Sequence, residues 1–525
     1  MSQPKANLTT ILPAWVKPTM LQGMLRGIER ETLRMQSDGY LSQESHPNAL
    51  GSALTHPHIT TDYSEALMEF ITPPQHNIPD VLDYLKDLHT VAHENLPKGE
   101  RLWAMSMPCM LNEEEDQIPL AQYGTSNLGR FKTLYRHGLG VRYGRRMQTI
   151  AGLHYNISFP DAFFKQLQQH ETDEQLKQLN LQDYRSARYF GLIRNFIRLT
   201  PMVMFLLGAS PTVCRSFLLG REHNLEPLIG GTLYKPYATA LRMGRIGYQN
   251  SAQKKLGIQY NNLDDYLTEL QKAVKTPFES FAKLGLENDQ GEPIQVNDHI
   301  LQIENEYYSL VRPKQVPQEN ETPSQALAKR GVQYVELRAV DINPYSPIGV
   351  DEASAGFLEI LALYCLLLDS PNISDDEQNQ IEANQIKMIE TGRDLNTLLV
   401  TPLGDMSISQ WLASHLSYMQ PIATLLDESY GCTLYSQALQ TMQKRGKNVD
   451  ETLSARVVGD MVAHGGTWRF GSALAEQHTD AYLKHTLSSQ KRAYFDGLVT
   501  TSHQEQQALE HNSKQTFQEY LSAFR

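Results

Sequence analysis

Short alternating segments dominate the pattern of apolar and polar positions between residues 20 and 350. Long connections, some of them helical, separate these segments, and a regular alternation of strands with helices is absent. The pattern predicts an α+β fold with an antiparallel or mixed sheet. The predicted strands are rich in β-branched, aromatic or alternating residues and cover 26–34, 66–72, 101–107, 147–159, 299–309 and 332–341.

Helical periodicity appears early in the chain in one segment and prevails from about residue 353 onward. Residues 80–97 carry leucines and valine three apart, which predicts an amphipathic helix. A second helix is predicted from Ala353 to Leu368, and a third begins at a capping box of Ser374 with Glu377. The polar segment 313–327 contains proline and is predicted to be a loop that covers a site. We therefore expect a sheet-containing domain over residues 1–370 and a helical subdomain, packed on it, over 371–525.

Pairs of charged residues two positions apart recur in three of the predicted strands. They are Glu29 with Glu31, Glu304 with Glu306, and Glu336 with Arg338. Alternate side chains of a strand share one face and lie roughly 6 to 7 Å apart. Two carboxylates about 5 Å apart at an effective dielectric near 20 repel by about 3 kcal/mol. Neighbouring strands of this kind would form an acidic wall that Mg²⁺ or Mn²⁺ could neutralise.

Further polar side chains occur near this predicted wall. His154 and Asn156 share a face of one strand, and the segment TTDYSEALMEFIT supplies Asp62 and Glu69. Each motif alone also fits a plainer interpretation, namely the solvated face of a half-buried sheet or a hydrogen-bonded core histidine. Arg338 beside Glu336 fits either a structural ion pair or a clamp for a transferring phosphoryl group.

Composition narrows the class of partner. The chain has 525 residues, enough for more than one domain, and a net charge of −12. This charge argues against nucleic acid or an anionic membrane as the main partner. The N-terminus lacks a secretory apolar core, and the longest apolar run, from Phe357 to Leu368, contains Glu359 and is too short to span a bilayer. We expect a soluble, cytoplasmic protein, with a monomer as the simplest assembly.

The cysteines and the missing motifs exclude several kinds of site. Four cysteines occur far apart without C-x-x-C spacing, which argues against a disulfide framework or a thiolate metal site, and Cys365 is expected in the core. A Walker A loop, a complete Rossmann fingerprint, a G-x-S-x-G elbow and an H-E-x-x-H helix are absent. A metal-dependent phosphohydrolase and a non-catalytic cation-binding protein remain open alternatives.

Several long blocks, in collinear order from about residue 20 to 370, carry a resemblance to a known family. They include GIERETLR, TTDYSEALMEFITP, AQYGTSN, LHYN, LQIENEYY and YVELRAVDINPYSPIGVD. Together they resemble the proteobacterial type of glutamate–cysteine ligase. The resemblance implies a glutamine-synthetase-like fold, in which a curved antiparallel sheet forms a half-barrel covered by helices. It also implies ATP-dependent joining of the L-glutamate side-chain carboxylate to the amine of L-cysteine, through a γ-glutamyl phosphate.

The resemblance also assigns expected roles to individual residues. The metal ligands, for Mg²⁺ or Mn²⁺, would be Glu29, Glu31, Asp62, Glu69, His154 and Glu336. Arg338 would lie near the transferred phosphate, so that Arg338, Glu29 and Glu336 form the expected catalytic set. The amino-acid pocket would be shaped by Tyr135, Gln148, Arg242, Tyr248 and Tyr308. A ligase of the same fold that uses another amine acceptor is the nearest alternative, and Glu304 and Glu306 are left without a role.

Overall fold

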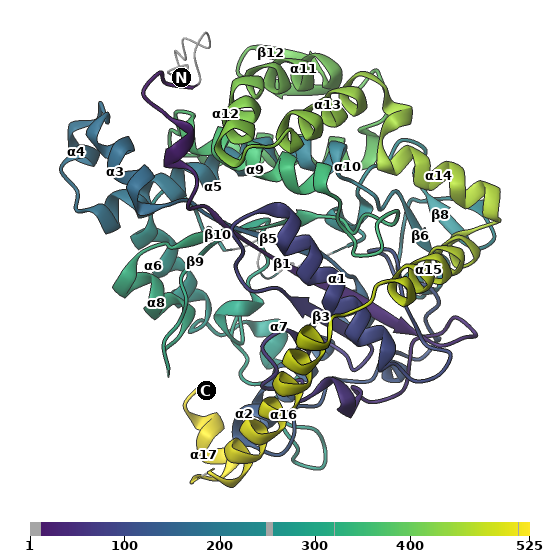
Figure 1. Cartoon of the computed structure of the whole chain (residues 1–525). Coiled ribbons are helices and arrows are strands. Elements are labelled where there is room, and N and C mark those ends of the chain that lie inside the picture. Colours follow the sequence, from purple (N-terminus) through teal and green to yellow (C-terminus); the bar gives the residue numbers. More distant parts are fainter. Residues whose placement is uncertain (1–11, 248–251, 253–255, 320, 513) are drawn as a thin grey trace.

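The computed structural model describes residues 12–247, 252, 256–319, 321–512 and 514–525. In this part of the chain a sheet of seven strands lies at the centre of the molecule (Figure 1), in the order β2-β3-β1-β5-β10-β9, and β4 pairs with β1. All of these pairs are antiparallel, which confirms the predicted α+β class. The strands are β1 Leu25–Met35, β2 Ile59–Thr61, β3 Leu67–Ile71, β4 Arg101–Leu102, β5 Leu153–Ser158, β9 Val311–Lys314 and β10 Tyr334–Val340.

Helices cover one face of this sheet. Strand side chains of that face, such as Ile28, Tyr155 and Leu337, are fully buried, and helices α1, α5 and α9 pack against the strands that carry them. The helices of the first part of the chain are α1 Ile78–Glu94, α2 Asn127–Tyr143, α3 Asp161–Gln169, α4 Glu174–Lys177, α5 Leu181–Leu206, α6 Leu263–Ala273, α7 Glu279–Ala282, α8 Pro323–Arg330 and α9 Glu352–Leu367.

Helix α9 is the apolar run identified in the sequence, and it is a buried core helix. Its Glu359 is fully buried and accepts two hydrogen bonds from Arg26 of β1, at 2.7 and 2.8 Å. Cys365 lies in the same helix and is also fully buried, as the sequence indicated. No helix among the described residues combines the length and the apolar character needed to cross a bilayer.

The chain after residue 370 is mainly helical. Its helices are α10 Asp375–Thr391, α11 Ile408–Tyr418, α12 Gln420–Tyr430, α13 Leu434–Lys447, α14 Leu453–His464, α15 Thr467–Lys484, α16 Ser489–His511 and α17 Phe517–Ser522, with a hairpin of β11 Leu398–Thr401 and β12 Gly404–Ser407. Helices α12 and α13 pack on α9, while α15, yellow in Figure 1, contacts α1, and α17 contacts α2. The C-terminal helices thus return to the elements that flank the sheet.

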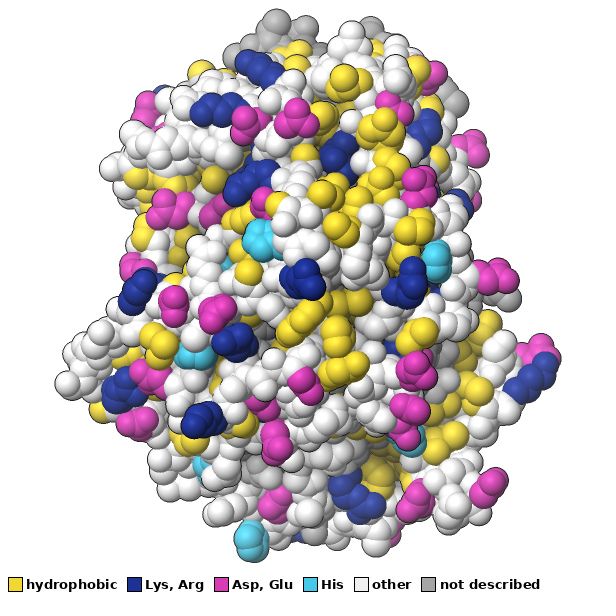
Figure 2. All heavy atoms as spheres, turned by 90° about the vertical axis from the view of Figure 1, so that its right-hand side faces the viewer, with side chains coloured by type: hydrophobic (Ala, Val, Ile, Leu, Met, Phe, Trp, Pro, Cys, Tyr) yellow, Lys and Arg dark blue, Asp and Glu magenta, His cyan; other side chains and the backbone are white. Residues whose placement is uncertain are grey.

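A small second sheet joins β6 Thr212–Cys214, β8 Thr232–Tyr234 and β7 Glu226–Ile229. On the molecular face drawn in Figure 2, acidic and basic side chains are interspersed. The net negative charge is therefore not gathered into one large patch on this face.

Two predictions about the segment before β10 are wrong. Residues 299–309 do not form a strand, because Glu304–Glu306 is a turn of 3₁₀ helix. The carboxylate of Glu304 instead accepts hydrogen bonds from the backbone N–H and the hydroxyl of Ser324, at 2.8 and 2.5 Å, at the start of α8. Segment 313–327 is not one loop, because β9 runs to Lys314 and α8 begins at Pro323 behind the capping box of Thr322 and Gln325.

The boundaries of other predicted elements differ less from those in the structure. Of the predicted strand 101–107 only Arg101–Leu102 pairs in the sheet, and the predicted strand 147–159 begins as a 3₁₀ helix, Arg146–Thr149, before β5. The helix that starts after Ser374 is present as α10; the Ser374 hydroxyl accepts the backbone N–H of Glu377.

Candidate active site

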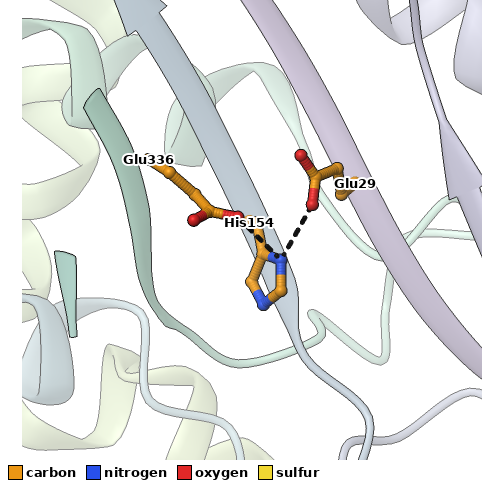
Figure 3. Close-up of side chains that lie close together, drawn as sticks. All are labelled: Glu29, His154 and Glu336. Atoms are coloured by element: carbon orange, nitrogen blue, oxygen red, sulfur yellow. Dashed lines mark hydrogen bonds and ion pairs between the residues drawn. The ribbon is translucent and has the colours of Figure 1, made fainter. Parts of the chain in front are cut away.

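The face of the sheet opposite α1, α5 and α9 is polar. Strand register places Glu29 of β1 beside His154 of β5, and Glu336 of β10 beside Asn156 of β5. His154 Nδ1 lies 3.2 Å from Glu29 Oε2 and 3.5 Å from Glu336 Oε1 (Figure 3). Asn156 Nδ2 donates to Glu29 Oε1 at 2.9 Å. Three central strands therefore bring one cluster of ligand-type side chains together.

A second cluster shares His154 with the first. Glu31 of β1 and Glu69 of β3 are register partners, and their carboxylates come close to the other side of the imidazole. His154 Nε2 lies 3.8 Å from Glu31 Oε1. In each cluster one ligand atom per residue can be chosen so that all lie within 4.8 Å of one another. Asp62, in the turn between β2 and β3, belongs to neither cluster but lines the cavity beside Glu31.

The electrostatics of the second cluster are unfavourable for ionised carboxylates. Burial and the neighbouring Asp62 raise the pKa of Glu31 to about 8. Burial, together with the charges of Asp62, Glu29 and Glu31, raises the pKa of Glu69 well above its usual range. These carboxylates therefore lack sufficient positive charge from the protein itself, and a bound cation would remove the conflict.

The first cluster has cationic partners. Lys314 Nζ lies 3.2 Å from Glu336 Oε2, and Arg338 Nη1 lies 3.1 Å from Glu336 Oε1. Although burial opposes ionisation, these two cations hold the pKa of Glu336 well below its ordinary value. Burial and the Arg338 charge lower the pKa of His154, so the imidazole is neutral at pH 7 and able to act as a ligand.

The donor set of the two clusters fits a divalent cation. Glu29, Glu31, Glu69 and Glu336 supply hard carboxylate oxygens of the kind that Mg²⁺ and Mn²⁺ prefer, and His154 adds one imidazole nitrogen that Mn²⁺ accepts readily. The raised pKa values of Glu31 and Glu69 are an independent sign that negative charge is concentrated there. These residues could hold metal ions at the polar face of the sheet.

A cavity of about 160 Å³ opens beside the clusters. Its walls include Arg338 and four of the five residues that the family resemblance assigned to an amino-acid pocket, namely Tyr135, Gln148, Arg242 and Tyr308. Tyr248, the fifth, lies outside the described residues. Arg242 is buried in the wall, where its Nε donates to Asp341 Oδ1 at 2.8 Å and its Nη2 donates to the Val340 carbonyl at 2.7 Å.

Arg338 has one end held by the protein and another turned to this cavity. Besides its ion pair with Glu336, its Nη1 lies 3.4 Å from His154 Nδ1. Its Nε is buried and has no hydrogen-bond partner among the described residues. The side chain thus forms the ion pair that the sequence suggested as one alternative. Because it is 18% exposed and lines the cavity, it can also donate to a ligand there.

Sequence reasoning missed two cations near the clusters. Arg312, which lines the cavity, is the register partner of Glu336, and Lys314 follows it on β9. Their segment contains Pro313, which favoured a loop in the sequence. Proline is tolerated in β9 because this strand is at the edge of the sheet. The two-residue spacing of Arg312 and Lys314 was the signal that could have found them.

Residues 130–146 include six basic side chains, Arg130, Lys132, Arg136, Arg142, Arg145 and Arg146, which lie in different environments. Arg136 lines the cavity, whereas the Arg142 side chain is buried against Glu306 and Arg146 donates to the backbone carbonyl of Ser216 at 2.7 Å. Glu306, whose pairing with Glu304 drew attention in the sequence, also lines the cavity. It accepts a hydrogen bond from the Tyr143 hydroxyl at 2.6 Å, so it joins α2 to the 3₁₀ helix Glu304–Glu306.

Comparisons with known proteins show which family the chain is similar to. The family model described as glutamate-cysteine ligase matches residues 11–388. A protein named glutamate–cysteine ligase from Alcanivorax borkumensis is 44% identical over 509 residues, which cover 96% of each chain. One of the same name from Azotobacter vinelandii is 42% identical over 525 residues, covering all of this chain and 98% of the relative.

Solved structures are similar as well. The structure of a glutamate–cysteine ligase from Francisella tularensis in complex with AMP has a TM-score of 0.90 and 31% sequence identity, covering 97% of this chain and 98% of the other. A bifunctional glutathione synthetase from Pasteurella multocida has a TM-score of 0.68 at 22% identity, and it covers 92% of this chain and 56% of the other. The second likeness concerns the fold alone.

Proposed function

The chain belongs to the glutamate–cysteine ligase family, and from this premise we propose that it joins the side-chain carboxylate of L-glutamate to the amine of L-cysteine at the expense of ATP. The products are γ-glutamylcysteine, ADP and phosphate, and the reaction is the first step of glutathione synthesis. Support for the substrates comes from the names of full-length relatives and from the AMP held by the Francisella tularensis structure. Because the reaction consumes ATP, we place it in the cytoplasm.

The chemistry requires two bond exchanges. A carboxylate is a poor electrophile, so one oxygen of the glutamate side chain first attacks the γ-phosphorus of ATP, and the bond from that phosphorus to ADP breaks. The amine of cysteine then attacks the carbonyl carbon of the acyl phosphate, phosphate leaves, and the nitrogen loses a proton. Neither exchange needs a covalent bond to the enzyme, so the task of the protein is to position the substrates and stabilise charge.

The state of Arg338 is the observation that carries this proposal. Glu336 fixes one end of the guanidinium through Nη1, while the side chain, which is 18% exposed, lines the cavity. A guanidinium held in this way can donate to the oxygens of a transferring phosphoryl group without first reorganising. Arg312 and Arg136 add positive charge to the same cavity and favour the entry of anionic substrates.

Magnesium, or manganese, would be held by Glu29, Glu31, Glu69, His154 and Glu336, with Asp62 close by. When bound, such an ion neutralises phosphate charge and polarises the phosphoryl group. The protein's own part is to orient these ligands from four adjacent strands, β3, β1, β5 and β10. Asn156 supports this arrangement by donating to Glu29, and the backbone N–H of Gly152 does so by donating to Glu31 Oε2 at 2.6 Å.

The remaining cavity residues form the amino-acid pocket in this proposal. Tyr135 and Tyr308 offer apolar ring surface with a hydroxyl group, which suits a small thiol side chain. Gln148 offers amide donors and an acceptor, and Arg242 brings a fixed positive charge that suits an amino-acid carboxylate.

One assay tests the function directly. ADP release is followed by a coupled assay with ATP, Mg²⁺ and glutamate, with and without cysteine, and the dipeptide is detected by mass spectrometry. We expect ADP in a 1:1 ratio to dipeptide, and only when both amino acids are present. Steady ADP release without an acceptor would contradict a ligase. A screen of other small amino acids as acceptors distinguishes cysteine from the related alternatives.

A further inference from the structure

Two cysteines that are 105 positions apart in the sequence meet in the fold. Cys109 lies in the irregular segment that follows β4, and Cys214 is the last residue of β6. Their Sγ atoms lie 2.7 Å apart. The other two cysteines have no such neighbour, since Cys365 is buried in α9 and Cys432 is exposed and lies by Asp427. Among the described residues this pair is therefore a distinct dithiol outside the acidic clusters.

The two cysteines differ in solvent exposure and in the pKa of their thiols. Cys109 is 1% exposed, whereas Cys214 is partly exposed. The Ser216 hydroxyl donates to Cys214 Sγ at 3.2 Å, and Arg215 is adjacent. Hydrogen bonds from Cys109 and Ser216 lower the pKa of Cys214 to about 6, although burial opposes this, while the contact with Cys214 and burial raise the pKa of the Cys109 thiol. Cys214 is thus the nucleophile and Cys109 the thiol that follows it.

Ser216 connects this pair to the cavity wall. Its hydroxyl also accepts the backbone N–H of Leu111 at 3.1 Å, and its carbonyl accepts a hydrogen bond from Arg146 at 2.7 Å. Arg146 begins the 3₁₀ helix Arg146–Thr149, which carries the cavity residues Met147 and Gln148. The segment that holds Cys214 is therefore one contact away from a wall of the cavity.

We propose that Cys109 and Cys214 form a reversible redox site, which small disulfide compounds oxidise to an intrachain disulfide and which thereby stiffens the 3₁₀ helix Arg146–Thr149. The Cys214 thiolate attacks one sulfur of the small disulfide, whose S–S bond breaks and releases one thiol. Cys109 then loses its proton and attacks Cys214 Sγ, which releases the second thiol. Two electrons pass from the protein to the small disulfide, and two small thiols result.

The experiment uses the full chain and 2-hydroxyethyl disulfide as the oxidant. After incubation the protein is unfolded, treated with N-ethylmaleimide, digested without reductant and analysed by mass spectrometry. We expect alkylated thiols to fall from four, the cysteine content of the chain, to two. A linked peptide pair that contains Cys109 and Cys214 should appear and should disappear with dithiothreitol. If both cysteines stay alkylated, or remain only as mixed disulfides, the proposal is wrong.

Single variants assign the order of attack. Cys109→Ser should trap the small thiol on Cys214 as a mixed disulfide, whereas Cys214→Ser should leave Cys109 reduced. Cys432→Ser is the matched control and should form the linked pair as the unmodified chain does. A mixed disulfide on Cys109 in the Cys214→Ser variant would overturn the assignment of Cys214 as the nucleophile.

Hydrogen exchange tests the link to the cavity wall without any need for enzymatic activity. Peptides that cover residues 146–149 should exchange more slowly in the oxidised chain than in the reduced chain, and Cys109→Ser should abolish this difference. Equal exchange in both forms, with the disulfide present, would contradict the proposed stiffening. Neither measurement depends on the proposed ligase reaction, so a failure of one proposal is distinguishable from a failure of the other.

Discussion

Arg142 and Glu306 form an ion pair at 3.1 Å in which both side chains are buried, with exposed fractions of 0% and 1%. Arg142 belongs to α2 and Glu306 to the 3₁₀ helix Glu304–Glu306. Glu306 also accepts hydrogen bonds from the Tyr143 hydroxyl at 2.6 Å and from the backbone N–H of Gln302 at 2.7 Å. The pair thus fastens a cavity-lining helix to the chain that leads into β9.

Removing the negative charge of this pair should destabilise the fold. Glu306→Gln leaves the Arg142 guanidinium buried without its counter-charge, and breaking such a pair costs about 3 kcal/mol. We expect the free energy of unfolding, measured by urea denaturation, to fall by about this amount. Glu279→Gln is the matched control, because its partner Lys283 and Glu279 itself are 73% and 83% exposed. The control should change stability by less than about 0.5 kcal/mol, and equal losses would contradict the structural role of Glu306.

Arg338→Ala should lower turnover far more than metal affinity. Loss of one preorganised donor to a developing charge reduces kcat by roughly 10²- to 10³-fold. The acidic residues of the clusters remain, so the Kd for Mn²⁺, measured by titration calorimetry, should change much less. Arg492→Ala is the control, since Arg492 forms a surface pair with Glu94. Parallel losses of kcat and of Mn²⁺ affinity would favour a purely structural ion pair with Glu336.

Glu29→Gln and Glu336→Gln should each weaken metal binding. The substitution removes a charge but keeps the size of the side chain, and even a lost supporting contact typically costs about 10- to 100-fold in affinity. Mn²⁺ titration of each variant, without substrates, measures this directly. Glu304→Gln is a suitable control, because Glu304 contacts Ser324 at the start of α8 and lies outside both clusters. Unchanged Kd values for both site variants would refute the metal assignment.

Acid should destabilise the C-terminal helices through His415 of α11. Burial lowers the pKa of His415 to about 4, and its Nδ1 contacts the Tyr364 hydroxyl at 3.0 Å. The unfolded chain binds a proton near pH 6.5, whereas the folded chain does so only near pH 4. The contribution of neutral His415 to the free energy of unfolding is therefore fully present above pH 6.5, and it is lost as the pH falls toward 4.

Between pH 7.5 and pH 5, His415 should lower the free energy of unfolding by about 2 kcal/mol. Urea denaturation at these two pH values, for the unmodified chain and for His415→Gln, measures it as the difference between the two pH effects. Other buried histidines contribute equally to both chains and cancel. An identical pH effect in the variant would show that His415 does not titrate in this way.

The two-residue spacing of charges was sufficient to find most of the acidic face. Glu29, Glu31 and Glu336 lie on one face because alternation along a strand is a local property, and β1 and β10 are strands. The same spacing misled at Glu304 and Glu306, since hydrogen bonds to Ser324 and Arg142, distant in the sequence, stabilise a 3₁₀ turn there instead.

What the sequence by itself determined is four central strands of the sheet, β1, β3, β5 and β10, the buried helix α9 and the side chains that share a face with Glu29, because these follow from periodicities of two and 3.6 residues. Only the tertiary structure decided strand order and register, and hence that His154 lies between two acidic clusters. It alone brought Lys314 to Glu336 and Cys109 to Cys214. The physical reason is that such contacts depend on packing between distant segments, which no local pattern records.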